Sequence, residues 1–447
     1  MDTIFALATA QGRAGVAVIR ISGPDAATAS ARLMSTVPAK RGLRKLTDTE
    51  GALIDEALVL RFDAGKSFTG EDVIELQLHG SPAVVAAMLR LLGDDWALRP
   101  AEPGEFTQRA FLNGKLDLDQ AEAVADLIHA KSIKAVDAAH QQLEGRLGEH
   151  IKTFRQQIID ATAMVELELD FIEEDVEFAN KEQLRKLLTE LDLEIGRLLD
   201  TYETGRLVKD GVKTVFIGKP NAGKSTLLNT LVGTERAIVT EIAGTTRDTI
   251  DADWSYEGLL FKLIDTAGLR DTEDRIEAEG VKRSQKAFEQ ADLVVYLKDL
   301  ILPLTTEERE EIAQFQKRAA DTPFLLIGTK LDLEKQKDDE RLQYDLKISA
   351  LEEQNIDQLK KLMKQRALEN KDYDTSSLLV TSSRHRDGLQ KARENVQRAI
   401  NALDQGLTGD FLSIDLRAAL KELGTITGEI TTEDLLDSIF SRFCIGK

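Results

Sequence analysis

The sequence contains very little cysteine: Cys444 is the only one among 447 residues. A single thiol excludes an intramolecular disulfide and fits a reducing compartment, so we expect the protein to be cytoplasmic. Long apolar runs are missing as well, and the longest, such as Leu293 to Leu297, are far shorter than a membrane-spanning helix of about 20 residues. The segment Phe5 to Ala10 follows neither a basic region nor a long apolar stretch, which favours a strand of the mature protein over a signal peptide.

Positive charge is also scarce. Lysine and arginine number 58 against 78 aspartates and glutamates, which gives a formal net charge of -20. Such a chain repels nucleic acid at long range, so contact with RNA requires a local basic patch or a basic partner protein. The content of 42% hydrophobic and 30% charged residues is typical of a folded globular protein, and the length predicts about three domains.

The middle of the chain, from Val212 to about Lys371, alternates short apolar runs with polar, helix-like stretches. This alternation indicates an α/β domain with a parallel sheet. The predicted strands are Thr214 to Gly218, Leu259 to Asp265, Leu293 to Leu297, Pro323 to Thr329 and Asp345 to Ser349.

Helical periodicity flanks this block on both sides. Apolar residues recur at a helical spacing from Ile151 to Tyr202, and the same spacing returns from Leu389 to Leu423. A helix with one apolar stripe buries it against a partner, so the two flanks are predicted to form one bundle into which the α/β domain is inserted. Two separate helical domains are the alternative.

The N-terminal part of the chain differs again. Its β-rich runs, such as Val16 to Ser22 and Val73 to His79, are separated by Gly and Pro turns, and one Ala-rich helix begins at about Pro82. We therefore predict an α+β domain over residues 1–115, helical parts over 116–210 and 372–447, and the α/β domain over 211–371. The acidic run from Glu173 to Glu177 is interpreted as a solvated loop between helices rather than a metal site.

The string GKPNAGKS, from Gly218 to Ser225, fits the phosphate-loop pattern G-x-x-x-x-G-K-[ST] and lies between a predicted strand and a helical run. The glycines let backbone N–H groups face phosphates, Lys224 reaches the β and γ oxygens, and Ser225 can ligate Mg²⁺. The phosphate site is completed by Asn221, Ala222, Gly223 and Thr226. A chance glycine-rich turn is the alternative, which the following motifs argue against.

Three further motifs follow in the order expected of a GTPase. Asp265, Thr266, Ala267 and Gly268 end a strand, where the carboxylate can hold the water shell of the metal and the Gly268 N–H can sense a γ-phosphate. In the motif Thr329, Lys330, Leu331 and Asp332, the last carboxylate accepts hydrogen bonds from the N1–H and 2-amino group of guanine. Adenine lacks both donors, so Asp332 selects GTP over ATP. Ser349 and Ala350 supply a backbone contact to the base.

Two positions depart from a plain switch GTPase. Thr329 stands where Asn is usual, and we expect it to weaken the hold on the base without changing the choice made by Asp332. Leu269 stands where Ras-like proteins use Gln to orient the attacking water. Hydrolysis therefore needs another polar group, and it needs the positive charge of an arginine finger, which is worth roughly 10³ to 10⁵ in rate.

The loop from Thr240 to Asp248 offers a way to place that charge. With flexible Gly244 and several free carbonyls, it is suited to hold a monovalent cation beside the β and γ phosphates, with Asn221 as a side-chain ligand. Thr246 would then be the switch threonine on Mg²⁺. An ordinary polar switch loop is the alternative.

Strings along the whole chain resemble the MnmE (TrmE) family of tRNA-modification GTPases. They are GKPNAGKS, IAGTTRD, DTAGLR, GRAGVAVIRISG, SFTGED, PGEFTQRAFLNGKLDLDQAEAV and the C-terminal FCIGK. The resemblance implies a folate-binding N-terminal domain that dimerises, a helical domain and an inserted Ras-like GTPase domain whose copies pair across the nucleotide in a potassium-dependent way. It also implies a homodimer in complex with an FAD-dependent partner protein. Together they modify carbon 5 of the wobble uridine of certain tRNAs with a carboxymethylaminomethyl group.

The resemblance also assigns residues of the nucleotide site. The implied potassium ligands are Asn221, Thr240, Ile242 and Thr245, and the implied Mg²⁺ ligands are Ser225 and Thr246. The same loop contributes Glu241, Ala243 and Gly244 to the nucleotide site. The resemblance implies that Glu277 orients the attacking water. Glu277 would thereby supply the polar group that is missing at Leu269. Without the resemblance, Glu277 would be interpreted as an exposed carboxylate on an acidic helix.

In the N-terminal domain, the resemblance places contacts to 5-formyltetrahydrofolate, or a related tetrahydrofolate, on Arg20, Glu75, Lys115 and Lys447. The amino edge of a pterin suits a carboxylate such as Glu75, and the glutamate tail suits a cation such as Arg20 or Lys115. Cys444 lies in the C-terminal motif near the folate, with an implied part in the chemistry. From composition alone, each of these residues could equally be a surface group.

The leading interpretation is an enzyme component that couples GTP hydrolysis to tRNA modification. A ribosome-assembly or signalling switch that binds rRNA is the rival, but such switches usually carry a basic appendage after the GTPase domain, and the segment after Lys371 has no basic cluster. A nucleotide-gated scaffold with a vestigial folate domain is a third possibility. The acidic balance predicts that the FAD-dependent partner supplies most of the basic surface for tRNA.

Overall fold

The computed structural model describes residues 2–34, 36–96, 98–170, 181–234, 252–265, 286–319, 322–334, 342–368 and 378–447. Contacts along the chain divide it into two compact units. The first contains Met1–Ile128, Ala139–Gly196 and Asp387–Lys447, and the second contains His129–Ala138 and Arg197–Arg386. None of the helices in the described ranges combines the length and the apolar character needed to cross a lipid bilayer. The four domain boundaries stated above stay predictions.

The N-terminal part of the first unit is built on a six-stranded sheet. Its elements are β1 Ile4–Leu7, β2 Val16–Ser22, α1 Ala26–Leu33, β3 Arg41–Thr47, β4 Leu53–Phe62, β5 Val73–His79, α2 Pro82–Arg90, a π-helical turn Leu91–Asp95 and β6 Arg99–Pro100. The strand order is β3-β4-β5-β2-β1-β6, and all neighbours are antiparallel except β1 and β6. Because β-strand side chains alternate, Ile19 and Ile21 of β2 face one buried layer with Leu33 of α1 and Met88 of α2. The α+β prediction for this part is confirmed.

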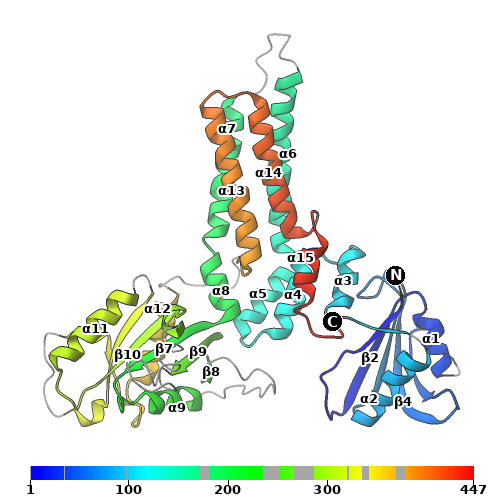
Figure 1. Ribbon diagram of the computed structural model, residues 1–447, viewed down its shortest axis with the longest axis horizontal. Coiled ribbons are helices and arrows are strands. Elements are labelled where there is room, and N and C mark those ends of the chain that lie inside the picture. The colour runs from blue at the N-terminus through cyan, green and yellow to red at the C-terminus, as the bar shows by residue number, and fades with distance from the viewer. Residues whose placement is uncertain are drawn as a thin grey trace, which may run out of the picture. The chain divides into compact units, whose positions relative to one another are not determined.

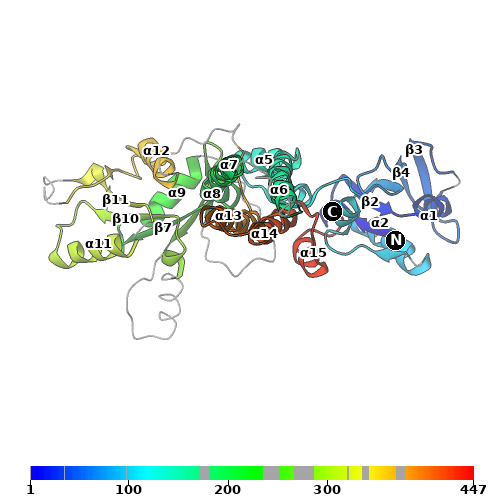
Figure 2. The same ribbon diagram turned by 90° about the horizontal axis from the view of Figure 1, so that it is seen from above.

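The helices outside the nucleotide domain come from both sides of that domain in the sequence. They are α3 Glu105–Leu112, α4 Leu118–His129, α5 Ile133–Leu143, α6 Arg146–Asp170, α7 Lys181–Leu199, α13 Ser383–Asp404, α14 Gly409–Thr427 and α15 Glu433–Phe440. Most of their residues belong to the first unit, but residues 129–138, 197–199 and 383–386 belong to the second. Helices α6 and α14 pack along each other, and α7 lies beside α13 (Figures 1 and 2). The Nε atom of Arg393 on α13 donates to Oδ1 of Asp192 on α7 at 2.9 Å. The prediction of one bundle made from two separate stretches is therefore confirmed, and two separate helical domains are excluded.

The second unit holds the predicted α/β domain. Its elements are α8 Tyr202–Asp210, β7 Val212–Gly218, α9 Lys224–Thr234, β8 Ala252–Tyr256, β9 Leu259–Asp265, β10 Leu293–Asp299, α11 Thr306–Ala319, β11 Phe324–Thr329, a 3-10 turn Leu331–Leu333, β12 Leu346–Lys347 and α12 Ile356–Ala367. The sheet order is β12-β11-β10-β7-β9-β8, and β8 is the one antiparallel strand. The carboxyl ends of β7, β10, β11 and β12 therefore meet along one edge, where ligands bind in open α/β sheets.

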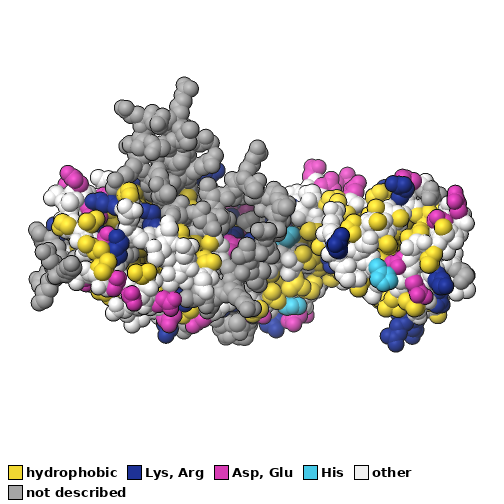
Figure 3. Space-filling model, turned by 90° about the horizontal axis from the view of Figure 1, so that it is seen from below, with side chains coloured by type: hydrophobic (Ala, Val, Ile, Leu, Met, Phe, Trp, Pro, Cys, Tyr) yellow, Lys and Arg dark blue, Asp and Glu magenta, His cyan; other side chains and the backbone are white. Residues whose placement is uncertain are grey.

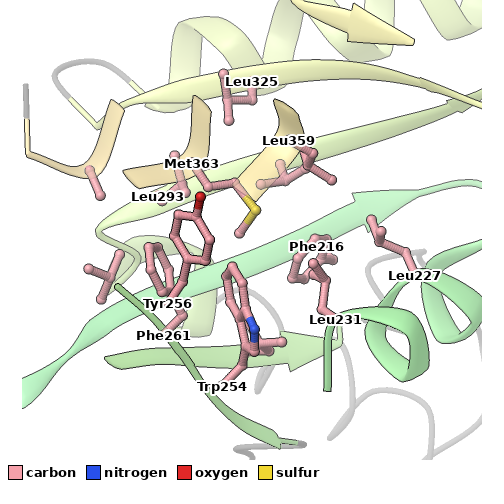
Figure 4. Packing of buried hydrophobic residues seen from close by; sticks show 14 of the residues in the cluster. Phe216, Leu227, Leu231, Trp254, Tyr256, Phe261, Leu293, Leu325, Leu359 and Met363 are labelled. Atoms are coloured by element: carbon pink, nitrogen blue, oxygen red, sulfur yellow. The ribbon is translucent and has the colours of Figure 1, made fainter. Parts of the chain in front are cut away.

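Strand β8 is missing from the predicted strands because its sequence, ADWSY, mixes polar and aromatic residues. The structure supplies the reason for its place at the sheet edge. Trp254 and Tyr256 point to the same face and pack with Phe261 of β9, with ring centroids 5.6 and 4.9 Å from that of Trp254 (Figure 4). Phe216, Leu231 and Met363 extend the same buried cluster. Aromatic burial, rather than a long apolar run, thus specifies the strand.

Candidate functional site

The phosphate loop connects the end of β7 to the start of α9. At Gly218 a Cβ atom would lie 2.4 Å from the carbonyl oxygen of Leu297 on the neighbouring β10, so no side chain fits without moving the backbone. Gly223 has a φ of +91°, and Asn221 has a φ of 62° in the left-handed region. These constraints explain why the two glycines stand at the start and the end of the loop.

Lys224 is the first residue of α9, where the helix end adds partial positive charge. Its Nζ atom donates to the carbonyl oxygens of Gly218 at 2.7 Å and Lys219 at 3.2 Å. The ammonium group therefore lies over the loop's own backbone. Ser225 and Thr226 follow it in the first helical turn and are exposed. The predicted loop residues Asn221 to Thr226 are thus brought together around one helix N-terminus, which is a favourable place for an anion.

Thr329 has a role that the sequence analysis did not anticipate. It is buried, and its Oγ1 atom lies 2.8 Å from the carbonyl oxygen of Ala222 and 3.1 Å from that of Lys298, so its hydroxyl donates between the two. The side chain thereby ties the phosphate loop to the ends of β10 and β11. The hydrogen bond to Ala222 links the loop to the motif that contains Asp332.

The predicted base-recognition residues lie next to one another at the same edge. The Leu331 N–H donates to the Ile348 carbonyl at 3.0 Å, which joins the turn that carries exposed Asp332 to the residue before Ser349. Thr230 of α9 donates through Oγ1 to the Ala350 carbonyl at 3.1 Å. Lys330, with a φ of 62°, donates through Nζ to Oδ2 of Asp299 at 2.6 Å. The phosphate loop and the two base-recognition segments therefore belong to one connected framework.

Several predicted site residues lie outside the described residues. These are Thr240, Glu241, Ile242, Ala243, Gly244, Thr245 and Thr246 of the proposed cation loop, Thr266, Ala267 and Gly268 of the strand-end motif, and Glu277. Asp265 ends β9, but its side chain belongs to this group as well. Within the described ranges, no three His, Cys, Asp or Glu side chains converge in a way that could hold a metal ion. The metal and water-orienting assignments stay predictions.

In the N-terminal domain, three of the predicted folate contacts gather around Phe106. Arg20 on β2 lies opposite Glu75 on β5 and donates through Nε to Oε1 at 2.8 Å. The Arg20 guanidinium lies over the Phe106 ring, with Cζ 5.5 Å from the centroid. The Phe106 N–H donates to the carbonyl oxygen of Lys447 at 3.2 Å. Arg20, Glu75 and the chain end at Lys447 are therefore neighbours.

The C-terminal motif packs against the N-terminal sheet. A Cβ atom at Gly446 would lie 2.4 Å from the carbonyl oxygen of Leu7 at the end of β1, and Ile445 pairs with Pro103. Cys444 is a free, exposed thiol in this tail. Lys115 contacts a different segment, since its Nζ donates to the Gly65 carbonyl at 3.0 Å. The structure thus places Lys115 against the loop that follows β4.

Comparisons with known proteins match the whole chain. A family model described as MnmE helical domain matches residues 118–444, and one described as GTP-binding protein TrmE N-terminus matches residues 3–115. A protein named tRNA modification GTPase MnmE from Salinibacter ruber is 48% identical to this chain over 458 residues. The match covers 100% of this chain and 99% of the relative. The relative from Cytophaga hutchinsonii is 46% identical over 460 residues, with 100% and 98% covered.

The chain belongs to the MnmE family of tRNA modification GTPases. A relative of the same name from Clostridioides difficile is 41% identical over 462 residues and covers 100% of this chain. The resemblance drawn from the motifs is thereby confirmed, as is the prediction of a GTP hydrolase. In the MnmE family models, a TrmE N-terminal part over residues 3–115 is followed by a helical-domain match over residues 118–444.

This MnmE-family chain contains an ion network that the sequence analysis missed. Arg99 donates to Asp2 through Nε at 2.6 Å and to Glu105 through Nη1 at 3.0 Å, and buried Arg109 pairs with Asp2, Glu105 and Glu71. The hydrogen bond from Arg99 holds the pKa of the Asp2 carboxyl well below its usual range. The one available signal was the spacing of Glu105 and Arg109, which are four residues apart on α3.

This network predicts a pH dependence of stability. Because Asp2 has a lower pKa folded than unfolded, its stabilising effect is present above the unfolded pKa and is lost as the pH falls through the folded value. Arg99→Met should therefore lower the free energy of unfolding of the N-terminal domain at pH 7 by about 1 kcal/mol, since the pair is partly exposed and screened. The variant should also flatten the loss of stability as the pH falls below about 4, the unfolded pKa of an aspartate.

Urea unfolding followed by the fluorescence of Trp96, in a Trp254→Phe background, measures this effect. Arg61→Met is the matched control, because within the described part of the chain Arg61 forms an ion pair only with the more exposed Asp63. An Arg99→Met protein that loses stability on acidification as steeply as the unsubstituted protein would contradict the assignment.

Proposed function

We propose that the chain hydrolyses GTP at the loop Gly218 to Ser225 and uses this hydrolysis to drive modification of carbon 5 of the wobble uridine of certain tRNAs. The supporting observation is the joined framework of the site. Thr329 donates to Ala222 in the phosphate loop, and Thr230 of α9 donates to Ala350 in the base-recognition segment. A ligand with phosphates at one end and guanine at the other fits such a framework. The name shared by the MnmE relatives supports tRNA as the final substrate.

A modification assay tests this function directly. It combines the purified chain with an FAD-dependent partner protein, unmodified tRNA, a tetrahydrofolate one-carbon donor, an amine and GTP. Mass analysis of the digested tRNA should detect the carboxymethylaminomethyl group on uridine with GTP and not with GDP. Modification at the same rate without any guanine nucleotide would refute the coupling.

The metal ions have assigned places in this proposal. Mg²⁺ is held by Ser225, which is exposed in the first turn of α9, together with Thr246. K⁺ would be held by Asn221 with Thr240, Ile242 and Thr245. When bound, K⁺ supplies the positive charge that an arginine finger supplies elsewhere. Glu277 orients the attacking water, the task for which Leu269 is unsuited.

The folate site is proposed for the surroundings of Arg20 and Glu75. Their side chains form an ion pair at 2.8 Å, and both are partly accessible, with 17% and 16% of the side-chain surface exposed. A carboxylate held in this way can accept hydrogen bonds from the amino edge of a pterin. Lys447 lies beside Phe106, and Cys444 belongs to the same tail. Lys115 is assigned to the glutamate tail of the ligand.

Glu75→Gln is expected to lower the affinity for 5-formyltetrahydrofolate about tenfold or more. The variant keeps the shape of the side chain but removes the charge, and a hydrogen bond to a charged acceptor contributes about 1.5 to 3 kcal/mol. Isothermal titration calorimetry on the full chain measures the change. Glu56→Gln, an exposed carboxylate on the adjacent strand β4, is the matched control and should bind as the unsubstituted chain does. Unchanged folate binding in Glu75→Gln would contradict the assignment.

The excess of acidic over basic residues determines which protein we expect to bind tRNA in the proposed assembly. We propose that the chain forms a homodimer, which contributes the one-carbon donor and a conformational change driven by GTP. The FAD-dependent partner supplies most of the tRNA-binding surface. On the face drawn in Figure 3, the Lys and Arg side chains of the described residues lie in separate small groups among acidic ones. Tight tRNA binding by a single-sign basic surface is therefore expected of the partner. The assembly is assigned to the cytoplasm.

A further inference from the structure

A buried carboxylate lies between two lysines beside the phosphate loop. Glu308 is in the first turn of α11, and its side chain is only 4% exposed. Its Oε2 atom lies 3.3 Å from Nζ of Lys219, the second residue of the phosphate loop, and 3.7 Å from Nζ of Lys298. The site proposed above for nucleotide makes no use of Glu308 or Lys298.

Lys298 is an unusual residue for its position near the end of β10, because its side chain is only 2% exposed. Its Nζ atom donates to the carbonyl oxygens of Asp299 at 2.6 Å and Leu302 at 2.7 Å. An isolated buried ammonium is strongly unfavourable, and so is an isolated buried carboxylate. Lys298 and Glu308 are therefore mutually dependent, and Lys298 compensates the charge that Glu308 brings to the phosphate loop.

Lys219 connects this pair to the loop. Its side chain reaches Glu308, and its carbonyl oxygen is one of the two that accept hydrogen bonds from Lys224. The carbonyl of Lys298 also contacts the Thr329 hydroxyl, which contacts the Ala222 carbonyl at the other end of the loop. The strand end at Lys298 thus supports the phosphate loop at two places, once through Glu308 and Lys219 and once through Thr329.

We propose that Glu308 is a positioning residue for nucleotide binding, which acts by fixing Lys219 and thereby the backbone on which Lys224 rests. The inference rests on the proposed function, because it assumes that this loop binds the phosphates of a guanine nucleotide. Glu308 touches no phosphate itself. Lys298 holds Glu308 in place and offsets its charge.

Positioning and simple electrostatics predict opposite results. A carboxylate near bound phosphates repels them, so electrostatics alone predicts tighter nucleotide binding after Glu308→Gln. If the carboxylate positions the loop, the same substitution loosens Lys219 and weakens binding, because small misplacements of binding groups are costly. A positioning effect also depends on Lys219, whereas a Coulomb effect on the phosphates does not.

A double-mutant cycle in the full chain separates these cases. The dissociation constant of fluorescent methylanthraniloyl-GDP is measured for the unsubstituted chain, Glu308→Gln, Lys219→Met and the double variant. We expect each single substitution to raise the constant about tenfold and the double variant to raise it about tenfold as well, because contacting residues couple. Lys219→Arg keeps the ion pair and should therefore raise the dissociation constant much less than Lys219→Met does.

Glu307→Gln is the matched control, since Glu307 is the neighbouring carboxylate on α11 and is exposed. It removes the same charge from the same turn and should leave GDP binding unchanged. Thermal unfolding of each variant identifies any loss of folding, and Lys219→Met, at the more exposed end of the pair, provides the readout if Glu308→Gln does not fold. Unchanged or tighter GDP binding in Glu308→Gln, or additive effects in the double variant, would overturn the inference. Failure of the unsubstituted chain to bind GDP would instead refute the proposed function.

Discussion

GTP hydrolysis by this chain is expected to be about a hundredfold or more faster in potassium than in sodium at equal ionic strength. Leu269 stands where a glutamine would orient water, a task proposed above for Glu277, and the positive charge that stabilises the transition state is proposed to come from K⁺. Such a charge is worth roughly 10³ to 10⁵ in rate when an arginine supplies it. Initial rates of phosphate release, measured with saturating GTP and Mg²⁺ in the two chloride salts, give the ratio.

Asn221 is the described residue assigned to this cation. Its left-handed φ of 62° and its exposure place it on the outer side of the phosphate loop, next to the residues that start α9. Asn221→Ala should therefore bring the rate in potassium down to the rate in sodium. Asn229→Ala, an exposed asparagine on α9, should keep the full potassium effect. Equal rates of the unsubstituted chain in both salts would remove the cation from the mechanism.

The parts of the fold that were predictable are those with a strong local pattern. Strands β2 and β5 have the predicted bounds, and α2 begins at the predicted Pro82, because their apolar periodicity is uninterrupted. The bundle was predictable because helices on both sides of the inserted domain each carry one apolar stripe. Strand β8 was not, since two aromatic residues among polar ones stabilise it only once β9 and α9 are in place.

In the candidate site, too, the features with a local sequence pattern were predictable and the long-range contacts were not. The phosphate loop was predictable because its glycines, lysine and serine have a fixed spacing, which the close approach of Gly218 to Leu297 explains. The contacts that support the loop come from residues more than 30 positions away in the chain. Thr329 contacts Ala222, and Glu308 contacts Lys219, only because β10 and β11 lie beside β7 in the sheet. No local pattern marks a buried lysine such as Lys298 as a charge partner.

Asp332→Asn is expected to reduce the affinity for GTP about a thousandfold and to create binding of xanthosine triphosphate. In the proposed site the carboxylate accepts two hydrogen bonds from guanine, and a site built for such bonds rejects a mismatched ligand by large factors. Xanthine has a carbonyl in place of the 2-amino group of guanine. This carbonyl can accept a hydrogen bond from the side-chain NH₂ group of Asn. Because Asp332 is exposed, the loss should stay below that of a fully buried site. Competition with fluorescent GDP measures the affinities for GTP, xanthosine triphosphate and ATP.

Asp357→Asn, on helix α12, is the matched control. The Asp357 side chain is 88% exposed and, among the residues that the structure describes, forms an ion pair only with Lys360. This variant should bind GTP as the unsubstituted chain does. Both variants keep Lys224, the proposed phosphate contact, so a change confined to Asp332→Asn reports on the base alone. Two outcomes would show that the turn after β11 does not recognise the base. One is an Asp332→Asn variant that keeps its affinity for GTP, and the other is an unsubstituted chain that binds ATP as tightly as GTP. The connected framework of Thr329, Ala222 and Ala350 would then need a different ligand.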